Sequence, residues 1–219
     1  MTTTTKREGV FAPSTATLSD ALDRLGRDGS ILGIGPLTNG QRLYGRAYTV
    51  KYVPAGHPPG TVGDYLDDVG PGQVVVLDND GRVDATVWGD ILTALAHVKG
   101  VSGTVIDGVN RDVAKALELG YPVYSRGRYM RTGKDRVEVA AVQIPVNIGG
   151  VKVSPGDLLV GDDDGVVRIP RDVEDEVLRL AAEIDAREDA ILAAVLAGAS
   201  IAEAREAHGY HTLQRRGGH

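Results

Sequence analysis

Short runs of apolar and β-branched residues, separated by glycine and polar turn signals, fill most of the chain up to Pro170. Runs of about four to eight such residues between turn signals predict strands. The predicted strands are Leu43–Val53, Val74–Leu77, Thr86–Trp88, Thr104–Ile106, Pro122–Tyr124, Val137–Val146 and Leu158–Ile169. We expect tight turns at Asp80-Gly81, Gly149-Gly150 and Asp164-Gly165, because each pair lies between two apolar runs.

Helices are predicted where apolar residues recur at helical spacing among these strands. The predicted helices are Ser19–Leu25, Asp90–Lys99 and Asp112–Leu119. The last two begin with a carboxylate and are followed by Gly100 and Gly120, which are typical start and stop signals. The alternation of strand and helix from Thr86 to Tyr124 predicts a parallel sheet with right-handed crossovers.

The composition changes after Pro170. The stretch from Asp172 to about Ala197 contains no Gly or Pro and is rich in Ala, Glu, Leu and Arg, which predicts a long helix. A short helix is expected over Ser200–His208, and a frayed tail after Leu213. Because the strands from Val137 to Ile169 read as antiparallel, we expect a layered α/β sandwich with a mixed sheet. The core would cover residues 1–170, and residues 171–219 would form a helical extension that packs on the core or on a neighbouring subunit.

Composition narrows the classes of protein that the chain could represent. Its 219 residues are 42% hydrophobic and 25% charged, which is typical of one folded domain. The net charge of −6 argues against a nucleic-acid partner, because phosphate binding needs a concentrated basic face. We expect no membrane span, since no run of ~18 apolar residues is present, and Met1–Glu8 lacks the apolar core of an export signal. The chain has no cysteine, which excludes disulfides and thiolate chemistry and fits a reducing cytoplasm.

The first candidate for chemistry is the segment Trp88-Gly89-Asp90-Ile91-Leu92, where a predicted strand turns directly into a helix. The start of a helix presents free backbone N–H groups at the positive end of the helix dipole, which favours carboxylates and phosphates. Asp90 would be the capping side chain. The alternative is that Asp90 only caps the helix, as Asp commonly does at this position.

The second candidate is the next strand-to-helix turn, Asp107-Gly108-Val109-Asn110-Arg111-Asp112. Arg111 at a helix start opposes the helix dipole, so its placement suggests an anion in the same crevice. Neighbouring turns of a parallel sheet lie side by side, so Asp90, Arg111 and Asp112 are expected to converge. Two carboxylates and a guanidinium suit a hard divalent cation and an anionic substrate. The alternative is an ion pair that ties two loops together.

The third candidate is Glu188. On the C-terminal helix, an apolar seam recurs at steps of four and three residues, and Glu188 interrupts it; the seam consists of Val177, Ala181, Ile184, Glu188, Ile191 and Val195. A carboxylate within an apolar seam is costly unless it is paired or used. Glu188 could therefore reach into an active site, or it could lie at a bend where the seam changes face.

Several polar motifs carry less weight. Asp162-Asp163-Asp164-Gly165 lacks the alternating ligand spacing of a calcium loop, and Asp78-Asn79-Asp80-Gly81 reads as a hairpin turn. Gly33-Ile34-Gly35 lacks the third glycine of a dinucleotide-binding fingerprint. His57 lies in a loop rich in proline and glycine, Val53–Gly60, which reads as surface.

These segments resemble the family named for the regulator of ribonuclease E activity A, which also contains the 4-hydroxy-4-methyl-2-oxoglutarate aldolases. The resemblance covers nearly the whole chain and is weakest before Leu43. It is carried by Trp88-Gly89-Asp90, Gly103–Asp112, Gly120-Tyr121-Pro122-Val123, Pro145–Val151, Pro155-Gly156-Asp157 and Gly161–Val167. The aldolase branch is marked by an Asp, twenty intervening residues and then Arg-Asp, and Asp90 with Arg111-Asp112 meets this spacing.

The resemblance implies a role for each candidate residue. Asp112 would be the protein ligand of a Mg²⁺ or Mn²⁺ ion, and Arg111 would contact the keto acid and stabilise enolate charge. The backbone amides around Gly89, Ile91 and Leu92 would hold the substrate carboxylate, while Asp90 would act through a water molecule held by the metal. A glutamate from a neighbouring subunit's C-terminal helix completes the family's site, and Glu188 looks like its counterpart, with Glu183 as the alternative.

The implied activity is divalent-metal-dependent cleavage of 4-hydroxy-2-oxo acids with two or three carboxylates, such as 4-hydroxy-4-methyl-2-oxoglutarate, to pyruvate. Oxaloacetate decarboxylation passes through the same enolate and would be a side activity. The resemblance also implies a fold like the swivelling phosphohistidine domain, assembled as a homotrimer or a hexamer. Two alternatives stay open, namely a non-catalytic regulator that binds ribonuclease E and a lyase that acts on another 2-oxo or sugar acid. The Pro-Gly-rich loop at Val53–Gly60 is unusual for the family and leaves the precise substrate open.

Overall fold

The computed structural model describes residues 13–209 of the chain. Its helices are α1 (Thr15–Arg24), α2 (Asp90–Val98), α3 (Val113–Leu119), α4 (Glu174–Leu196) and α5 (Ile201–Ala207), with 3₁₀ turns η1 (Asp64–Asp68) and η2 (Arg171–Val173). Its strands are β1 (Ser30–Ile31), β2 (Gly35–Pro36), β3 (Leu43–Pro54), β4 (Gln73–Thr86), β5 (Gly103–Asn110), β6 (Val123–Arg128), β7 (Val137–Val142), β8 (Val146–Ile148), β9 (Val151–Val153), β10 (Leu158–Asp162) and β11 (Gly165–Ile169). No helix within residues 13–209 is long and apolar enough to cross a membrane.

A mixed sheet organises the fold. Within residues 13–209 it has nine strands in the order β1-β11-β10-β3-β4-β5-β6-β2, and β7 pairs with β3 outside this path. Strands β3 to β6 are parallel to one another, whereas β10, β11 and β7 are antiparallel to their neighbours. The predicted α/β class and mixed sheet are confirmed. A separate two-stranded hairpin, β8–β9, turns at Gly149-Gly150 as predicted.

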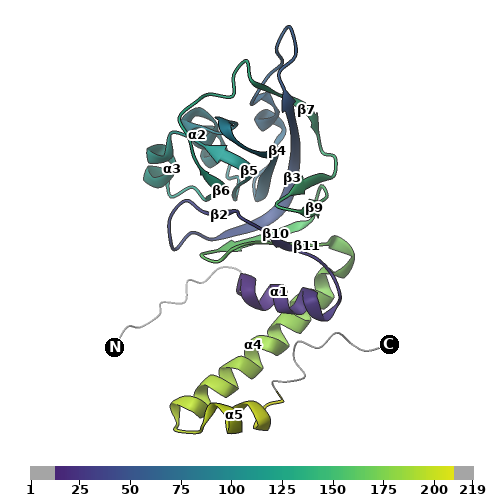
Figure 1. Ribbon diagram of the computed structural model, residues 1–219, viewed down its shortest axis with the longest axis vertical. Coiled ribbons are helices and arrows are strands. Elements are labelled where there is room, and N and C mark those ends of the chain that lie inside the picture. Colours follow the sequence, from purple (N-terminus) through teal and green to yellow (C-terminus); the bar gives the residue numbers. More distant parts are fainter. Residues whose placement is uncertain (1–12, 210–219) are drawn as a thin grey trace.

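Apolar packing on both faces of the sheet fixes the central strands. Every residue of β5 is buried, as expected for a parallel strand that is covered on both sides. One core cluster lies under α2 and α3 and contains Trp88 and Tyr121, and a second lies on the opposite face with Val105 and Ile148. Figure 1 shows α2 and α3 together on one side of the sheet. The carboxyl ends of β4 and β5 are therefore held rigidly where the chain turns into these two helices.

The C-terminal helix α4 packs on α1 rather than on the parallel strands. Val177, Ala181 and Ile184 of the predicted seam are buried against Leu18 and Leu22 of α1 in a third core cluster. Beyond these residues α4 projects away from the sheet and ends against α5, as Figure 1 shows. The long helix predicted after Pro170 is confirmed, although its first residues form the 3₁₀ turn η2.

Four local predictions differ from the structure. The predicted strand Val137–Val146 is divided, because β7 ends at Val142 and Val146 begins β8 of the separate hairpin. Asp80-Gly81 does not connect two strands, because both residues have positive φ angles inside the single long strand β4, where the register with β5 shifts. The hairpin interpretation of Asp78–Gly81 is therefore wrong. Residues that readily adopt positive φ angles can form a bulge within one strand as well as the turn of a hairpin. Thr86 ends β4, and Val87 and Trp88 lie outside any strand. Helix α1 begins four residues earlier than predicted, because the Ser14 hydroxyl accepts from the Thr17 amide and caps it.

Two of the sequence predictions lie outside the described residues. These are the absence of an export signal in Met1–Glu8 and the frayed tail after Leu213.

The close approach of β3 to β4 gives a test of the fold. A Cβ added at Gly45 would lie 2.3 Å from the Gly72 carbonyl oxygen and 3.1 Å from Val74 Cγ2. Gly45→Ala should lower the free energy of unfolding by about 2 kcal/mol, because the backbone must move to admit the methyl group. Gly35→Ala is the matched control, since nothing lies within 4 Å of its added Cβ. Urea denaturation measures both, and equal stability of the two variants would contradict the packing described.

Candidate functional site

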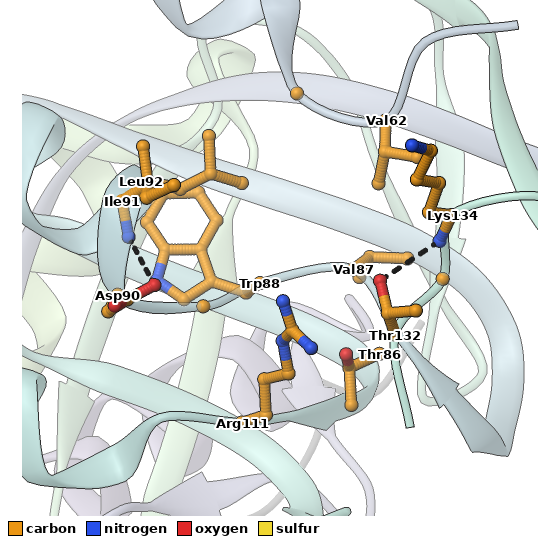
Figure 2. Close-up of a pocket in the computed structure, with 13 residues that line it drawn as sticks. Val62, Thr86, Val87, Trp88, Asp90, Ile91, Leu92, Arg111, Thr132 and Lys134 are labelled. Atoms are coloured by element: carbon orange, nitrogen blue, oxygen red, sulfur yellow. Dashed lines mark hydrogen bonds between the residues drawn. The ribbon is translucent and has the colours of Figure 1, made fainter. Parts of the chain in front are cut away.

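A hollow of about 240 Å³ lies where β4 and β5 end and α2 begins. Figure 2 shows Asp90, Ile91 and Leu92 on one side, Val62 and Lys134 on the other, and Arg111 reaching in between them. The carboxyl edge of a parallel sheet is the usual place for ligands in such folds. The lining residues are Val62, Gly63, Thr86, Val87, Trp88, Gly89, Asp90, Ile91, Leu92, Arg111, Thr132, Gly133 and Lys134.

The two predicted strand-to-helix turns meet at one mouth of this hollow. The amide of Arg111 donates to the Trp88 carbonyl at 3.0 Å, which joins the turns through their backbones. Arg111 Nε lies 3.2 Å from Asp112 Oδ2, and the same oxygen lies 3.5 Å from the Asp90 amide nitrogen. The structure therefore brings the Arg111 and Asp112 side chains beside the backbone of Asp90, while the Asp90 carboxylate accepts from the Ile91 amide.

Glycine at position 89 permits this approach. A Cβ added there would lie 2.8 Å from Asp112 Oδ2 and 3.4 Å from Arg111 Nε. Gly89, not Asp90, is the N-cap residue of α2. Asp90 is the first helical residue and not the capping residue that the sequence predicts. Its Oδ1 nevertheless accepts from the Ile91 amide in the first turn of the helix, at 2.8 Å.

Asp112 adopts a backbone conformation that is uncommon for a residue with a side chain. Its φ and ψ angles are 55° and 40°, and it precedes α3 without making a side-chain cap bond to the helix. Asp tolerates the left-handed region better than most residues, at a cost of order 1–3 kcal/mol. This backbone turn places the carboxylate beside Gly89 and leaves it 40% exposed, with Arg111 as its ion-pair partner.

A buried hydrogen-bond chain fixes the turn before α2. Trp88 Nε1 donates to Thr93 Oγ1 at 2.9 Å, and Thr93 Oγ1 donates to the Gly89 carbonyl at 2.8 Å. Trp88 and Thr93 are each only 2% exposed, and the indole stacks on Tyr121 with ring centroids 6.2 Å apart. The first turn of α2, which carries the predicted Gly89, Ile91 and Leu92 amides, is thus tied to the core.

The far wall of the hollow was not predicted. The Thr86 amide donates to the Arg131 carbonyl at 3.0 Å, and Gly133 packs so closely on Thr86 that a Cβ would lie 2.3 Å from its carbonyl oxygen. On the same side, Tyr52 donates its hydroxyl proton to the Val62 carbonyl at 2.6 Å. A sequence signal was available, because the segment after β6 must leave the same edge of the sheet as the ends of β4 and β5.

The donor set at the mouth suits a hard divalent cation. Within residues 13–209 there is no cluster of three His, Cys, Asp or Glu side chains, so the site lacks the closed cage of a structural zinc centre. Mg²⁺ instead takes one or two carboxylates together with waters and substrate oxygens. Asp112 and Asp90 offer this number of carboxylates beside the hollow, so the residues present fit the divalent ion that the sequence resemblance implies.

Among the contacts of residues 13–209, none joins Glu188 to this mouth. It is exposed on α4, where the neighbouring acidic groups are Asp20 of α1 and Asp185 and Asp189 of α4. Its carboxyl pKa is raised, because partial loss of hydration disfavours the charged form and these three carboxylates add negative charge. The alternative, Glu183, is ion-paired with Arg179 at 2.5 Å, whereas Glu188 has no ion-pair partner among the described residues.

The buried chain through Thr93 gives a test of the site's support. Thr93→Val should lower the free energy of unfolding by about 2 kcal/mol, because Trp88 Nε1 would lose its partner inside the core, whereas the Gly89 carbonyl would keep its bond from the Thr93 amide. Thr93→Ser keeps the hydroxyl and should retain most of that stability. Urea denaturation compares the two variants. A Val variant as stable as the Ser variant would show that the hydrogen bonds of the Thr93 hydroxyl contribute nothing to the stability of the fold.

Comparison with known proteins identifies the family to which this sequence is related. The sequence model of the RraA-like family, described as Aldolase/RraA, matches residues 15–168. Protein DlpA of Legionella pneumophila is 41% identical over 201 residues, which are 90% of this chain and 32% of that protein, so the chain spans about a third of its length. A protein of Halalkalibacterium halodurans named "Putative 4-hydroxy-4-methyl-2-oxoglutarate aldolase" is 35% identical over 187 residues, which are 84% of this chain and 87% of that protein.

Solved structures agree with this relationship. An uncharacterised protein from Pseudomonas syringae pv. tomato has a TM-score of 0.82 and 43% identity, and the match covers 88% of this chain and 92% of that one. RraAS2 of Streptomyces coelicolor, described as an unusual member of the RNase ES inhibitor RraA protein family, has a TM-score of 0.74 and 32% identity, covering 80% of this chain and 89% of that one. The chain therefore belongs to the RraA-like family.

Proposed function

We propose that this protein is a divalent-metal-dependent aldolase that cleaves 4-hydroxy-2-oxo acids carrying two or three carboxylates to pyruvate. 4-Hydroxy-4-methyl-2-oxoglutarate is the type substrate, and oxaloacetate decarboxylation is the expected side activity. The observation that carries the proposal is the meeting of Asp90, Arg111 and Asp112 at one mouth of the hollow. The relative in Halalkalibacterium halodurans, whose name includes this activity, supports it.

The pyruvyl half of the substrate would bind at the α2 side of the hollow. Its carboxylate would accept from the amides in the first turn of α2, at Ile91 and Leu92, where the helix leaves N–H groups without intrahelical partners. Binding there requires the Ile91 amide to give up its bond to Asp90 Oδ1. The guanidinium of Arg111, which is 39% exposed and reaches into the hollow, would contact the keto oxygen.

Cleavage then needs one proton removed and one added. The C4 hydroxyl loses its proton, the C3–C4 bond breaks, and its electron pair passes into the C2–C3 bond to give the enolate of pyruvate. The other half leaves as a carbonyl compound, and a proton returned to C3 completes pyruvate. No lysine of the turns at Asp90 and Arg111 is available for a Schiff base. A divalent cation held by Asp112 would supply Lewis-acid stabilisation of the enolate charge.

Three residues would stabilise the enolate or assist the transfer of the proton. Arg111 carries a fixed positive charge at the mouth of the hollow, where preorganised charge stabilises a developing oxyanion most effectively. Asp90 would position the water that takes the hydroxyl proton. Glu188 would assist it from the α4 helix of a neighbouring copy in a homotrimer or hexamer, because its raised pKa and lack of an ion-pair partner among residues 13–209 suit proton transfer better than the paired Glu183.

The metal ligand provides the first test. Asp112→Asn should lower metal-dependent pyruvate release from 4-hydroxy-4-methyl-2-oxoglutarate by about 100-fold or more, since several kcal/mol of charge stabilisation depend on the ion. Asp175→Asn, an exposed change at the start of α4, is the control and should leave the rate unchanged. Pyruvate is measured by a coupled assay with and without chelator. Full activity of the Asp112 variant, or wild-type activity in chelator, would rule out the proposed chemistry.

The origin of the glutamate is tested by mixing variants. Glu188→Gln and Asp112→Asn should each be inactive alone, but co-refolded mixtures should regain activity, because some assembled sites would combine an intact Asp112 with an intact Glu188 of a neighbour. Glu183→Gln is the control and should stay active by itself. Mixtures that remain inactive while forming mixed oligomers would place the glutamate elsewhere, and so would full activity of Glu188→Gln.

A further inference from the structure

A second cavity lies beside the start of α4, away from the hollow. Its volume is about 450 Å³, which is within the range of small-molecule sites. Figure 1 shows β9, β11 and the first turns of α4 close together, away from α2. The hollow and this second cavity share no lining residue within residues 13–209. The lining residues of the second cavity are Gly26, Arg27, Asp28, Gly150, Val151, Lys152, Arg168, Pro170 and Asp172.

Two of the three cations in this lining are already paired with carboxylates. Arg168 Nε donates to Asp157 Oδ2 at 2.7 Å, and the two side chains are largely buried, at 14% and 5% exposed. Arg27 Nη2 lies 3.3 Å from Asp172 Oδ2, and both of these side chains are exposed. Each pair balances its own charge, so neither pair calls for a charged ligand.

Two further charges of the lining, of opposite sign, have no such partner. The Lys152 ammonium and the Asp28 carboxylate make no hydrogen bond or ion pair, with each other or with any other group in the part of the chain that the structure describes. A lone exposed charge is satisfied by water, but here a cation and an anion line one cavity. A ligand that pairs with both must carry a carboxylate and an ammonium group.

The backbone holds Asp28 at a fixed place on one side of the cavity. Just before it, the Arg27 amide donates to the Leu22 carbonyl at 3.0 Å, a bond that closes the end of α1. Just after it, the Gly29 carbonyl accepts from the Arg168 amide of β11 at 2.8 Å. Asp28 therefore lies between two residues whose backbones are bonded to regular elements of the fold.

Strand β9 holds Lys152 on the other side of the cavity. Its neighbours Val151 and Val153 are buried, at 7% and 0% exposed, so the Lys152 side chain points away from the core. The hairpin that contains β9 is itself tied to the sheet, because the Gly149 amide donates to the buried Asp107 carboxylate at 2.8 Å. The ammonium group is thus carried by a strand whose place is fixed.

The rest of the lining suits a short aliphatic group. Val151 and Pro170 are buried residues that give the cavity an apolar wall. A Cβ added at Gly26 or Gly150 would meet no atom within 4 Å, so space stays open at both glycines. An α-amino acid carries an ammonium group, a carboxylate and a side chain on one carbon atom. An aliphatic amino acid therefore matches the two unpaired charges together with the apolar wall.

We propose that the second cavity is a binding site for an aliphatic α-amino acid, whose carboxylate pairs with Lys152 and whose ammonium group pairs with Asp28. The existing pairs of Arg27 with Asp172 and of Arg168 with Asp157 would stay intact. Binding here does not depend on the cleavage reaction proposed above, since the two sites are built from different residues.

L-Valine and two analogues that each lack one charge test this site by isothermal titration calorimetry with the full chain. 3-Methylbutanoate lacks the ammonium group, and 2-methylpropan-1-amine lacks the carboxylate. L-Valine should bind at one site per chain, and each analogue should bind about tenfold more weakly or worse, the factor that corresponds to ~1.4 kcal/mol. No binding of L-valine, or an analogue that binds as tightly as L-valine, would overturn the proposal.

Two variants assign the charges. Lys152→Gln should weaken binding of L-valine about tenfold and abolish its advantage over 2-methylpropan-1-amine. Asp28→Asn should weaken it similarly and abolish the advantage over 3-methylbutanoate. The controls are Lys115→Gln, an exposed lysine of α3 paired with Glu118, and Asp112→Asn at the hollow, and both should bind L-valine as the wild type does. Unchanged binding in either cavity variant, or loss of binding in Asp112→Asn at unchanged fold stability, would contradict this assignment.

Discussion

The approach of the Arg111-Asp112 turn to Gly89 is the contact on which the rest of the site depends. With any side chain at position 89, a Cβ would stand 2.8 Å from the carboxylate of Asp112. The backbone bond from Arg111 to the Trp88 carbonyl then holds the two turns in register. Because each turn leads into a helix, this contact brings the carboxylate of Asp112 and the guanidinium of Arg111 beside the first turn of α2.

The sheet supplies the rigidity that this contact needs. Strand β5 is buried along its whole length. The indole of Trp88 is held by a hydrogen bond to Thr93 and by stacking on the ring of Tyr121. Opposite them, the wall that carries Lys134 is tied to the end of β4 through Thr86. The hollow is thus lined by four segments that are far apart in the chain, residues 62–63, 86–92, 111 and 132–134.

Local patterns were sufficient for the elements that position Asp90, Arg111 and Asp112. Helices α2 and α3 have clear starts and stops, and strand–helix alternation implies that successive turns lie side by side. Local patterns were misleading at Asp80-Gly81, because two residues that accept positive φ can form a bulge as well as a hairpin. The residue types at a turn indicate the backbone angles of those few residues, but they do not indicate with which strand the flanking residues pair.

The segment of Lys134 is expected at the carboxyl edge of the sheet because it follows β6, but its place across the hollow depends on the bridge between Thr132 and Thr86, which no local pattern indicates. Glu188 is a different case. Its interruption of an apolar seam was visible in the sequence, but within one chain it faces Asp20, Asp185 and Asp189 rather than the hollow. Its role in catalysis therefore stays a prediction that concerns a second copy of the chain.

Binding of Mn²⁺ tests most directly whether the two turns form a metal site. The measurement is a titration followed by electron paramagnetic resonance, in the presence of oxalate, whose two carboxylates resemble the enolate of pyruvate. Wild-type protein should bind one Mn²⁺ per chain, and Asp112→Asn should bind it far more weakly at unchanged fold stability. Equal binding by the two proteins, or none by the wild type, would contradict the assignment of this mouth as a metal-assisted active site.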